Sequence, residues 1–346
     1  MSLEISIVLS TYNALERLKN CLYSLTLQDV PLSKFEVIVV DDCSTDQTEE
    51  YMRSLISPYP ITYEKNEKNL GRSSTRNKGI RLARGKILIF CDCDMILPPE
   101  FVRNHLNYHE QNDWLVVCGS FWHQISTHPP LTFESIKNKH YLHHVTEQPW
   151  AYWFKQFVYK YGRNLTSFYF PWMYFVVMNV SVRKKHVTEV GGFDESFQGY
   201  GGEDEELGFR LYKRGLHFVM DQHLKNYHQE HPRAVNQHDE SQSNIDYILK
   251  KHQSIDTLLF YRINEYNHFY KNAVLQEIYR LPSSKENKDF LDMLVMMLTN
   301  ASIQKNETFK KDFVERFQSI NRQNYCPHLT MMIRKWLKKQ RRRRFT

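Results

Sequence analysis

The stretch Phe90-Cys91-Asp92-Cys93-Asp94-Met95 decides how this chain is interpreted. It closes an apolar run over residues 86–91, which is typical of a buried strand. Two carboxylates two residues apart on an extended segment point to the same side. A hard divalent cation prefers oxygen ligands and can bridge carboxylates to substrate phosphates. The position of Asp92 and Asp94 therefore favours a metal site over the alternative, a solvated strand end that caps a helix.

Short apolar runs alternate with helical patterns around this stretch. Strands are predicted at residues 5–9, 35–40, 61–64, 86–91, 114–118, 174–182 and 217–220. Helices are predicted at residues 15–25, 45–55, 72–84 and 203–214. Such alternation with apolar strands predicts an α/β fold, a mostly parallel sheet covered by helices on both faces. Ligands bind at the carboxyl ends of such strands, where Thr11, Asp42, Asp92 and Asp94 all fall.

Composition narrows the class of protein. The chain has 346 residues, 41% apolar content and a net charge of +7. The segment 334–344 alone carries eight positive charges, which leaves a net charge of −1 on the rest. A near-neutral body argues against a nucleic-acid partner. No run of about 20 apolar residues predicts a membrane span. The six cysteines form no CxxC pair and lie mostly in apolar runs, so reduced core residues and a cytoplasmic location are expected.

The pattern changes along the chain. Residues 1–239 are predicted to form the α/β domain. Within them, residues 121–171 are rich in aromatic residues and poor in periodicity, and we interpret them as an insertion that shapes the acceptor side. Residues 240–333 form a helical C-terminal region, and residues 334–346 a basic tail. The tail is either a solubilising end or a contact to an anionic membrane at the inner face, with Trp336, Leu337 and Phe345 as apolar anchors.

A second acidic cluster, Glu203-Asp204-Glu205-Glu206, follows Gly201-Gly202. Glycines allow a close approach of backbone to ligand, and one carboxylate here could act as a general base. The alternative is decoration of a helix start, where acids are favourable. Glu203 and Asp204 diverge in direction because a helix turns about 100° per residue.

Three other places in the sequence carry side chains that could bind a base, a phosphate or a metal. Asp41 and Asp42 end a strand, and we expect one to accept a hydrogen bond from a base and the other to cap a helix. Arg76 at a helix start could hold a phosphate or a base edge, or simply be solvated. His228 could be a third metal ligand beside the D-x-D, although imidazole is softer than oxygen. We interpret its neighbour His231 as a bystander.

Taken in order, these motifs resemble glycosyltransferase family 2 with the GT-A fold. The resemblance rests on residues 6–13, 39–46, 69–71, 76–79, 92–95, 191–195, 201–211 and 227–230, and spans roughly residues 4–232. The bacterial chondroitin and hyaluronan polymerase modules, with similar D-C-D-M, G-G-E-D-x-E and Y-H-Q-E stretches, are the most similar members. Galactosyltransferases with a G-G-E-D segment are more distant.

The resemblance implies a UDP-sugar donor. Ser10, Tyr12 and Asp42 would hold the uridine, and Arg76 would lie near the base or the diphosphate. Asp92 would meet the ribose or the metal, which is Mn²⁺ or Mg²⁺, and Asp94 and His228 would hold that metal. Asp204 would be the base, and Glu203 would contact the donor or acceptor sugar. Tyr200 stands where the family usually has Trp, and the chain carries one module where the polymerases join two.

The expected function is therefore a metal-dependent inverting transfer of a hexosyl or N-acetylhexosaminyl group from a UDP-sugar to an acceptor hydroxyl. Sugar, glycolipid and peptide acceptors all remain open. The alternatives are a protein-modifying glycosyltransferase, a non-catalytic subunit that binds sugar nucleotides, and a nucleotidyltransferase. The last would normally carry a basic Gly-rich phosphate loop near the N-terminus, and Thr11-Tyr12-Asn13 is not one.

Overall fold

The structure, a computed structural model, describes residues 3–128, 130–232, 237–263, 267–300, 303–304 and 306–342. The chain divides into two compact units. The first comprises Met1–Thr166 and Pro171–Asn244, and the second comprises Ser167–Phe170 and Ile245–Thr346. The division lies close to the sequence-based boundary at residues 239–240, but the short segment Ser167–Phe170 joins the second unit, which no sequence pattern indicated.

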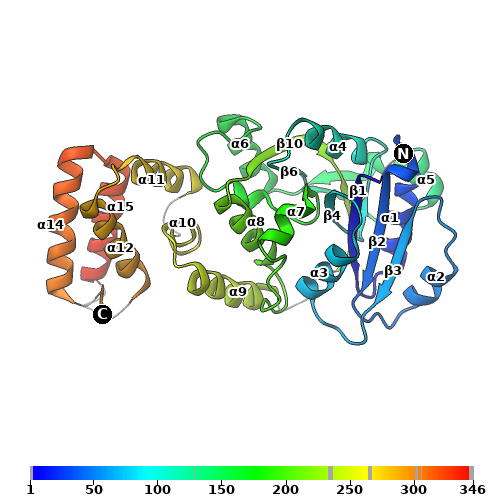
Figure 1. Cartoon of the computed structure of the whole chain (residues 1–346), viewed down its shortest axis with the longest axis horizontal. Coiled ribbons are helices and arrows are strands. Elements are labelled where there is room, and N and C mark those ends of the chain that lie inside the picture. The colour runs from blue at the N-terminus through cyan, green and yellow to red at the C-terminus, as the bar shows by residue number, and fades with distance from the viewer. Residues whose placement is uncertain are drawn as a thin grey trace. The chain divides into compact units, whose positions relative to one another are not determined.

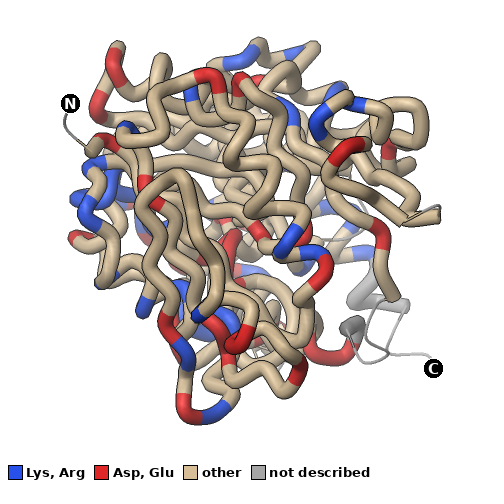
Figure 2. Tube along the Cα trace, turned by 90° about the vertical axis from the view of Figure 1, so that its right-hand side faces the viewer, with Lys and Arg blue, Asp and Glu red and all other residues tan. Residues whose placement is uncertain are grey.

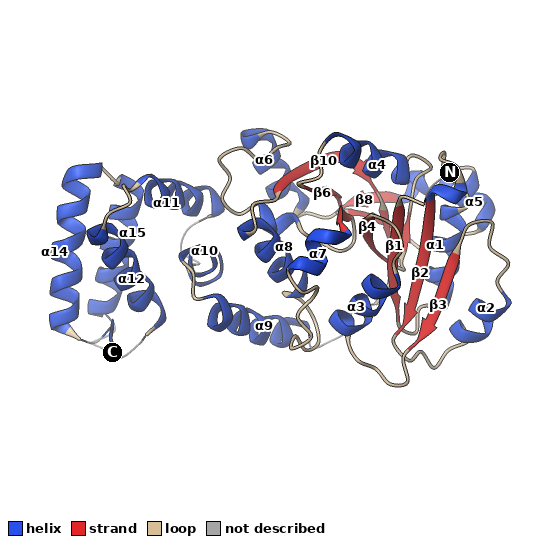
Figure 3. Ribbon diagram, in the orientation of Figure 1, coloured by secondary structure: helices blue, strands red, loops and turns tan. Residues whose placement is uncertain are grey.

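A seven-stranded sheet forms the centre of the first unit, in the order β10-β6-β9-β4-β1-β2-β3 (Figures 1 and 3). Its strands are β1 (Ile5–Thr11), β2 (Phe35–Asp41), β3 (Ile61–Lys65), β4 (Ile87–Asp92), β6 (Leu115–Ser120), β9 (Val180–Arg183) and β10 (His217–Lys225). Neighbouring strands are parallel except at β9, which runs antiparallel to β4 and β6. The predicted α/β fold with a mostly parallel sheet is confirmed.

Helices cover both faces of this sheet because its central strands are apolar on both sides. On one face Ile7 of β1 packs in a cluster with Leu18 of α1 and Val102 of α4. On the other face Val8 lies against Gly79 of α3, where a Cβ would come within 2.4 Å of the valine Cγ1. Outside the insertion at residues 121–171, the helices of this unit include α1 (Leu15–Leu25), α2 (Thr48–Ser54), α3 (Arg72–Leu82), α4 (Phe101–Gln111), α7 (Lys184–Glu189) and α8 (Glu203–Lys213), and η1 (Leu32–Lys34) is a 3₁₀ turn.

The strand predicted at residues 174–182 is wrong in extent. Only Val180–Arg183 is strand, and Pro171–Tyr174 forms a 3₁₀ turn, η3. Trp172 and Phe175 are buried against α8: the ring centroids of Trp172 and Phe209 lie 5.4 Å apart, and a Cβ at Gly208 would come within 2.5 Å of the Phe175 Cβ. An apolar run reports burial, and burial alone does not separate a strand from an irregular buried segment.

The insertion 121–171 contains four elements of at most five residues, too short to show a period, and one longer helix. The short elements are β7 (His123–Ile125), α5 (Phe133–Lys137), η2 (His140–His144) and β8 (Val145–Glu147), and the longer helix is α6 (Ala151–Tyr161). β7 and β8 join β5 (Met95–Ile96) and β11 (Tyr227–Gln229) in a second sheet of order β5-β11-β7-β8. This small sheet connects the stretch after the D-x-D to the segment that carries His228.

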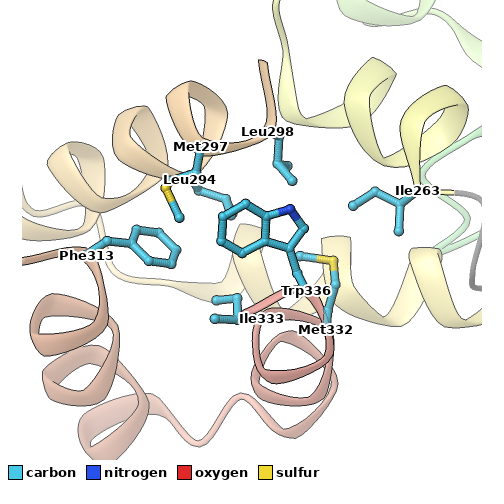
Figure 4. A pocket seen from close by; sticks show the side chains of 8 residues that line it. All are labelled: Ile263, Leu294, Met297, Leu298, Phe313, Met332, Ile333 and Trp336. Carbon is cyan, nitrogen blue, oxygen red and sulfur yellow. The ribbon is translucent and has the colours of Figure 1, made fainter. Parts of the chain in front are cut away.

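Helices dominate the C-terminal part. They are α9 (Gln237–His252), α10 (Ile255–Thr257), the π-helix η4 (Leu258–Arg262), α11 (His268–Arg280), α12 (Lys285–Thr299), α14 (Glu307–Asn324) and α15 (Pro327–Arg342). The second unit has its own apolar centre, in which Trp336 of α15 lies among Leu294 and Met297 of α12 and Phe313 of α14 (Figure 4). Trp336, predicted above as an apolar anchor, is half-buried and lines this apolar centre.

Acidic and basic residues are interspersed along the described trace (Figure 2), as expected for a body of nearly zero net charge. Within the described ranges, no helix combines the length and apolarity needed to cross a bilayer. Leu337 is half-buried on α15, and Phe345 lies outside the described residues. A membrane contact through the basic tail stays a prediction.

Candidate functional site

The D-x-D lies on the turn between β4 and β5, at the carboxyl end of the sheet. Ser10 on β1 pairs with Asp92 in the register of the sheet, so the two lie at the same level. β11 runs antiparallel to β5, with His228 opposite Met95. The Gln229 N–H also donates to the Asp94 carbonyl oxygen at 2.9 Å. Backbone hydrogen bonds therefore hold the histidine segment against the acidic turn.

Asp94 and two histidines converge on one point. The Asp94 Oδ2 atom lies 3.5 Å from His228 Nε2 and 3.2 Å from His231 Nε2. Single ligand atoms of the three residues all lie within 4.8 Å of one another. Asp94 Oδ1 is buried and has no hydrogen-bond partner among the described residues. This donor set, with one unpartnered oxygen, fits a divalent cation.

The electrostatics of Asp94 agree with that geometry. Burial by itself raises its pKa, but contacts with His228 and His231 outweigh burial and hold the pKa well below the usual range for Asp. Asp92 differs, because its pKa is raised by burial and by the nearby Asp94, against the opposing effect of Arg76. The two acids of the D-x-D thus sit in different environments.

A buried arginine joins the two acidic clusters. Arg76 on α3 places Nη1 2.8 Å from Glu203 Oε1 and 3.3 Å from Asp204 Oδ1. Its Nη2 lies 3.4 Å from Asp92 Oδ1. Arg76 as a whole is only 5% exposed, and its guanidinium lies 5.5 Å from the centre of the Phe193 ring. Its fork of donors suits several carboxylates at once, which an ammonium group could not match.

Glu203 and Asp204 begin α8, behind Gly202, whose φ of 93° favours glycine. Burial raises the pKa of Glu203, but Arg76 outweighs it and lowers the pKa overall. The pKa of Asp204 is raised well above its ordinary value by burial and by Glu203, although Arg76 and the Val177 N–H oppose this. That N–H donates to Asp204 Oδ2 at 3.2 Å. Arg76 at Oδ1 and the Val177 N–H at Oδ2 thus orient both carboxylate oxygens of Asp204.

The loop before α8 is fixed from α3. The Asn77 Nδ2 donates to the Phe193 carbonyl oxygen and to Glu195 Oε1, both at 2.8 Å, and its Oδ1 accepts from the Phe193 N–H at 2.8 Å. A Cβ at Gly192 would lie 2.6 Å from Asn77 Oδ1. Asn77 falls within residues 76–79, one of the stretches that carry the family resemblance, and no role was predicted for it. Its position next to Arg76 was the only available signal.

Asp41 and Asp42 both accept hydrogen bonds from other residues of this chain, but each from different donors. Asp41 Oδ1 accepts from the Ser44 N–H at 2.7 Å, a contact within the loop after β2. The helix cap predicted for one of the pair is wrong, because α2 begins at Thr48 after Gln47 and has no side-chain cap. Asp42 accepts from the Leu70 N–H at 2.8 Å and the Gly71 N–H at 2.9 Å, and from Asn66 Nδ2 at 2.9 Å. In this structure Asp42 therefore holds the loop that leads into α3.

We expect Asp42→Asn to loosen this loop, because the amide nitrogen would face an N–H group. Losing a charge-assisted acceptor for buried donors costs about 1–3 kcal/mol of unfolding free energy. Urea unfolding measures this cost, and the exposed Glu67→Gln in the same loop is the control, expected within about 0.5 kcal/mol of the wild type. If the two variants were equally stable, the loop would not depend on Asp42.

The remaining residues that were predicted to belong to the site lie near the same carboxyl edge of the sheet and make fewer contacts. Ser10 is half-buried at the end of β1, and Tyr12 is half exposed just beyond it. Tyr200 lies under the Arg72 guanidinium, at 4.8 Å from its ring centre. His231, which we interpreted as a bystander, comes closer to Asp94 Oδ2 than His228 does. The signal that could have found it is its spacing, three residues after His228.

Comparison with known proteins matches this architecture. The model of "Glycosyl transferase family 2" matches residues 6–177, and that of the "N-terminal domain of galactosyltransferase" matches residues 160–232. The uncharacterized glycosyltransferase YfnE of Bacillus subtilis is 34% identical over 73% of this chain and 71% of its own length. Validoxylamine A glucosyltransferase of Streptomyces hygroscopicus subsp. jinggangensis is 32% identical over 75% of this chain and 63% of its length.

Chondroitin synthase of Escherichia coli is 30% identical over 75% of this chain, which spans only 41% of that enzyme. Among solved structures, S. aureus TarS 1–349 has a TM-score of 0.53 with 16% identity, covering 92% of this chain and 90% of that one. A likeness at that identity establishes the GT-A fold alone. Because this family model matches residues 6–177 and YfnE is similar over most of both chains, the chain belongs to glycosyltransferase family 2.

Proposed function

We propose that this glycosyltransferase moves a sugar from a UDP-sugar to an acceptor hydroxyl with inversion at the anomeric carbon and with help from a divalent cation. The observation that carries the proposal is the convergence of two acidic clusters on Arg76, one of them next to the Asp94 and His228 pair. A binding protein would need the nucleotide contacts but would have no use for an oriented base such as Asp204.

In this mechanism Asp204 accepts the proton of the acceptor hydroxyl. Its raised pKa suits a general base, because a stronger base takes that proton more readily once ionised. The acceptor oxygen forms a bond to the anomeric carbon while the bond from that carbon to the diphosphate oxygen breaks. A single displacement of this kind inverts the anomeric centre and releases UDP. No covalent sugar–enzyme intermediate is required.

Other side chains hold the reacting groups. Arg76 and Glu203 fix the position of Asp204, so Glu203 acts here as a positioning residue; its predicted contact with the sugar stays a prediction. Asp94 and His228 would hold Mn²⁺ or Mg²⁺, and Asp92 would lie beside them. A cation at that position supplies charge that stabilises the departing diphosphate. Ser10, Tyr12 and Asp42 are proposed to form the nucleoside side of the site.

The donor and acceptor classes are drawn from the relatives. The structural neighbour TarS has been solved in complex with UDP-GlcNAc, and chondroitin synthase and a glucosyltransferase stand among the sequence relatives. These favour a UDP-activated hexose or N-acetylhexosamine and a carbohydrate acceptor in polysaccharide or glycoconjugate synthesis. A peptide acceptor is the second candidate, and acceptor competition would separate the two.

We expect purified protein to release UDP from at least one member of a panel of UDP-sugars. The rate should fall to background in EDTA and return with added Mn²⁺, because the diphosphate then regains its countercharge. A coupled assay for UDP, run with and without a carbohydrate acceptor, measures both transfer and hydrolysis. Full activity in chelator would remove the cation from the proposal, and no turnover with any donor would favour a non-catalytic binding subunit.

A further inference from the structure

Two histidines, rather than one, face the carboxylate of Asp94. His231 Nε2 lies 3.2 Å from Asp94 Oδ2, and His228 Nε2 lies 3.5 Å from the same oxygen. The two ring centroids are 5.0 Å apart, with their planes at 51°. The family resemblance supplies one late histidine at this place. The second, His231, follows three residues later in the stretch Tyr227-His228-Gln229-Glu230-His231-Pro232.

The orientation of the His231 ring is set by its own backbone. Its Nδ1 lies 2.8 Å from the Pro232 carbonyl oxygen, which can only accept, so Nδ1 carries a proton and donates it. Neutral imidazole in that tautomer presents a lone pair at Nε2. A carbonyl or carboxylate partner on the far nitrogen is the arrangement that fixes metal-ligating histidines.

When the ring is neutral, the Nε2 lone pair faces the Asp94 carboxylate oxygen, and this placement requires positive charge between the two atoms. His228 Nε2 faces the same oxygen at 3.5 Å, and all three ligand atoms fall within 4.8 Å of one another. A single divalent cation would supply that positive charge to the three donors together. Asp94 Oδ1, buried and without a partner among the described residues, is available to the same ion. Asp92 is instead engaged by Arg76 at 3.4 Å.

We propose that His231 is a third protein ligand of the metal and that it sets which ion is preferred. Two imidazole nitrogens and one carboxylate favour Mn²⁺, Co²⁺ and other transition ions over Mg²⁺, which prefers oxygen ligands. Neutral imidazoles leave more positive charge on the ion than a second carboxylate would, and this charge faces the diphosphate. Only the statement that this charge faces the diphosphate rests on the proposed function. The set of metal ligands can be tested with the metal alone.

The test titrates the full chain, without nucleotide, with Mn²⁺ followed by electron paramagnetic resonance and with Co²⁺ followed by its visible absorption. The variants are His231→Ala, His228→Ala and Asp94→Asn, and His217→Ala is the matched control, an exposed histidine at the start of β10. We expect His231→Ala to weaken Co²⁺ binding at least about 10-fold. Its Co²⁺ spectrum should change, while weak Mg²⁺ binding, measured by competition, should change little.

Two results would overturn the inference. The first is His231→Ala binding Mn²⁺ and Co²⁺ as tightly as the wild type and His217→Ala, which would leave His231 as a mere neighbour of Asp94. The second is a wild type that binds neither ion. Circular dichroism confirms that each variant is folded. Turnover of UDP-sugars by the wild type, measured separately, decides the proposed function, so the two can fail independently.

Discussion

Asp204→Asn is expected to bind the UDP-sugar as the wild type does and to lose transfer by about 10²- to 10⁴-fold, the usual contribution of a general base. Asparagine keeps the shape and an oxygen that can accept from the Val177 N–H, which is 3.2 Å away in the wild type. It cannot take a proton from the acceptor. Steady-state kcat with saturating acceptor, together with calorimetric binding of UDP, measures the two effects separately.

The control for this variant is Glu205→Gln, the next residue on α8, which removes a charge from the same helix turn. A helix turns about 100° per residue, so Glu205 points in a different direction from Asp204. We expect the control to keep kcat within a few-fold. An Asp204→Asn enzyme that turns over at near the wild-type rate would show that another group accepts the proton.

The pH profile provides a second readout of the same residue. The raised pKa of Asp204 comes first from burial and then from Glu203. A base works only when ionised, so kcat/KM should fall as the pH decreases through this raised pKa. The inflection should therefore lie well above the value of about 3.9 for an ordinary Asp. A profile that stays flat down to that value would contradict the assignment of Asp204.

Arg76→Met is expected to have the largest effect on stability. It removes the guanidinium that pairs with Glu203 at 2.8 Å, and the Glu203 side chain is only 6% exposed. Removing one partner of a buried ion pair costs about 3–5 kcal/mol, because the other charge stays buried. Arg76→Lys should cost less, since it keeps the charge but loses the fork. Urea unfolding measures the free energy of unfolding of the wild type, Arg76→Met and Arg76→Lys.

Arg53→Met is the matched control, because Arg53 pairs with Glu49 on the surface and is 74% exposed. Exposed pairs contribute about 0–1 kcal/mol. The loss of unfolding free energy in Arg76→Met should also depend on pH. The pKa of Glu203 is lowered in the folded protein, so its stabilising contribution is present above its unfolded pKa and is lost as the pH falls through the folded value. Asp204 has the opposite effect: because its pKa is raised in the folded protein, its ionisation at higher pH lowers the unfolding free energy. A stable Arg76→Met would show that the acids do not need Arg76.

The sequence was informative where local pattern and chemistry coincide. Apolar runs such as residues 86–91 and the Gly-led helix at Glu203 predicted the strand, the helix and the sheet edge that carries the acids. The order of short motifs indicated the family. The prediction failed at residues 174–182, where aromatic burial against α8 mimicked a strand, and in the insertion, whose strands of three residues are too short to show a period.

The sequence by itself determined which chemical groups are present and that most of them follow strands of one sheet, since hydrophobic periodicity is a local property. Only the tertiary structure decided how they combine. It directed Asp42 into its own loop, joined Asp92, Glu203 and Asp204 through Arg76, and brought His231 to Asp94. These pairings connect residues far apart in the chain, so they depend on how β11, α3 and α8 pack around the sheet, which no local pattern encodes.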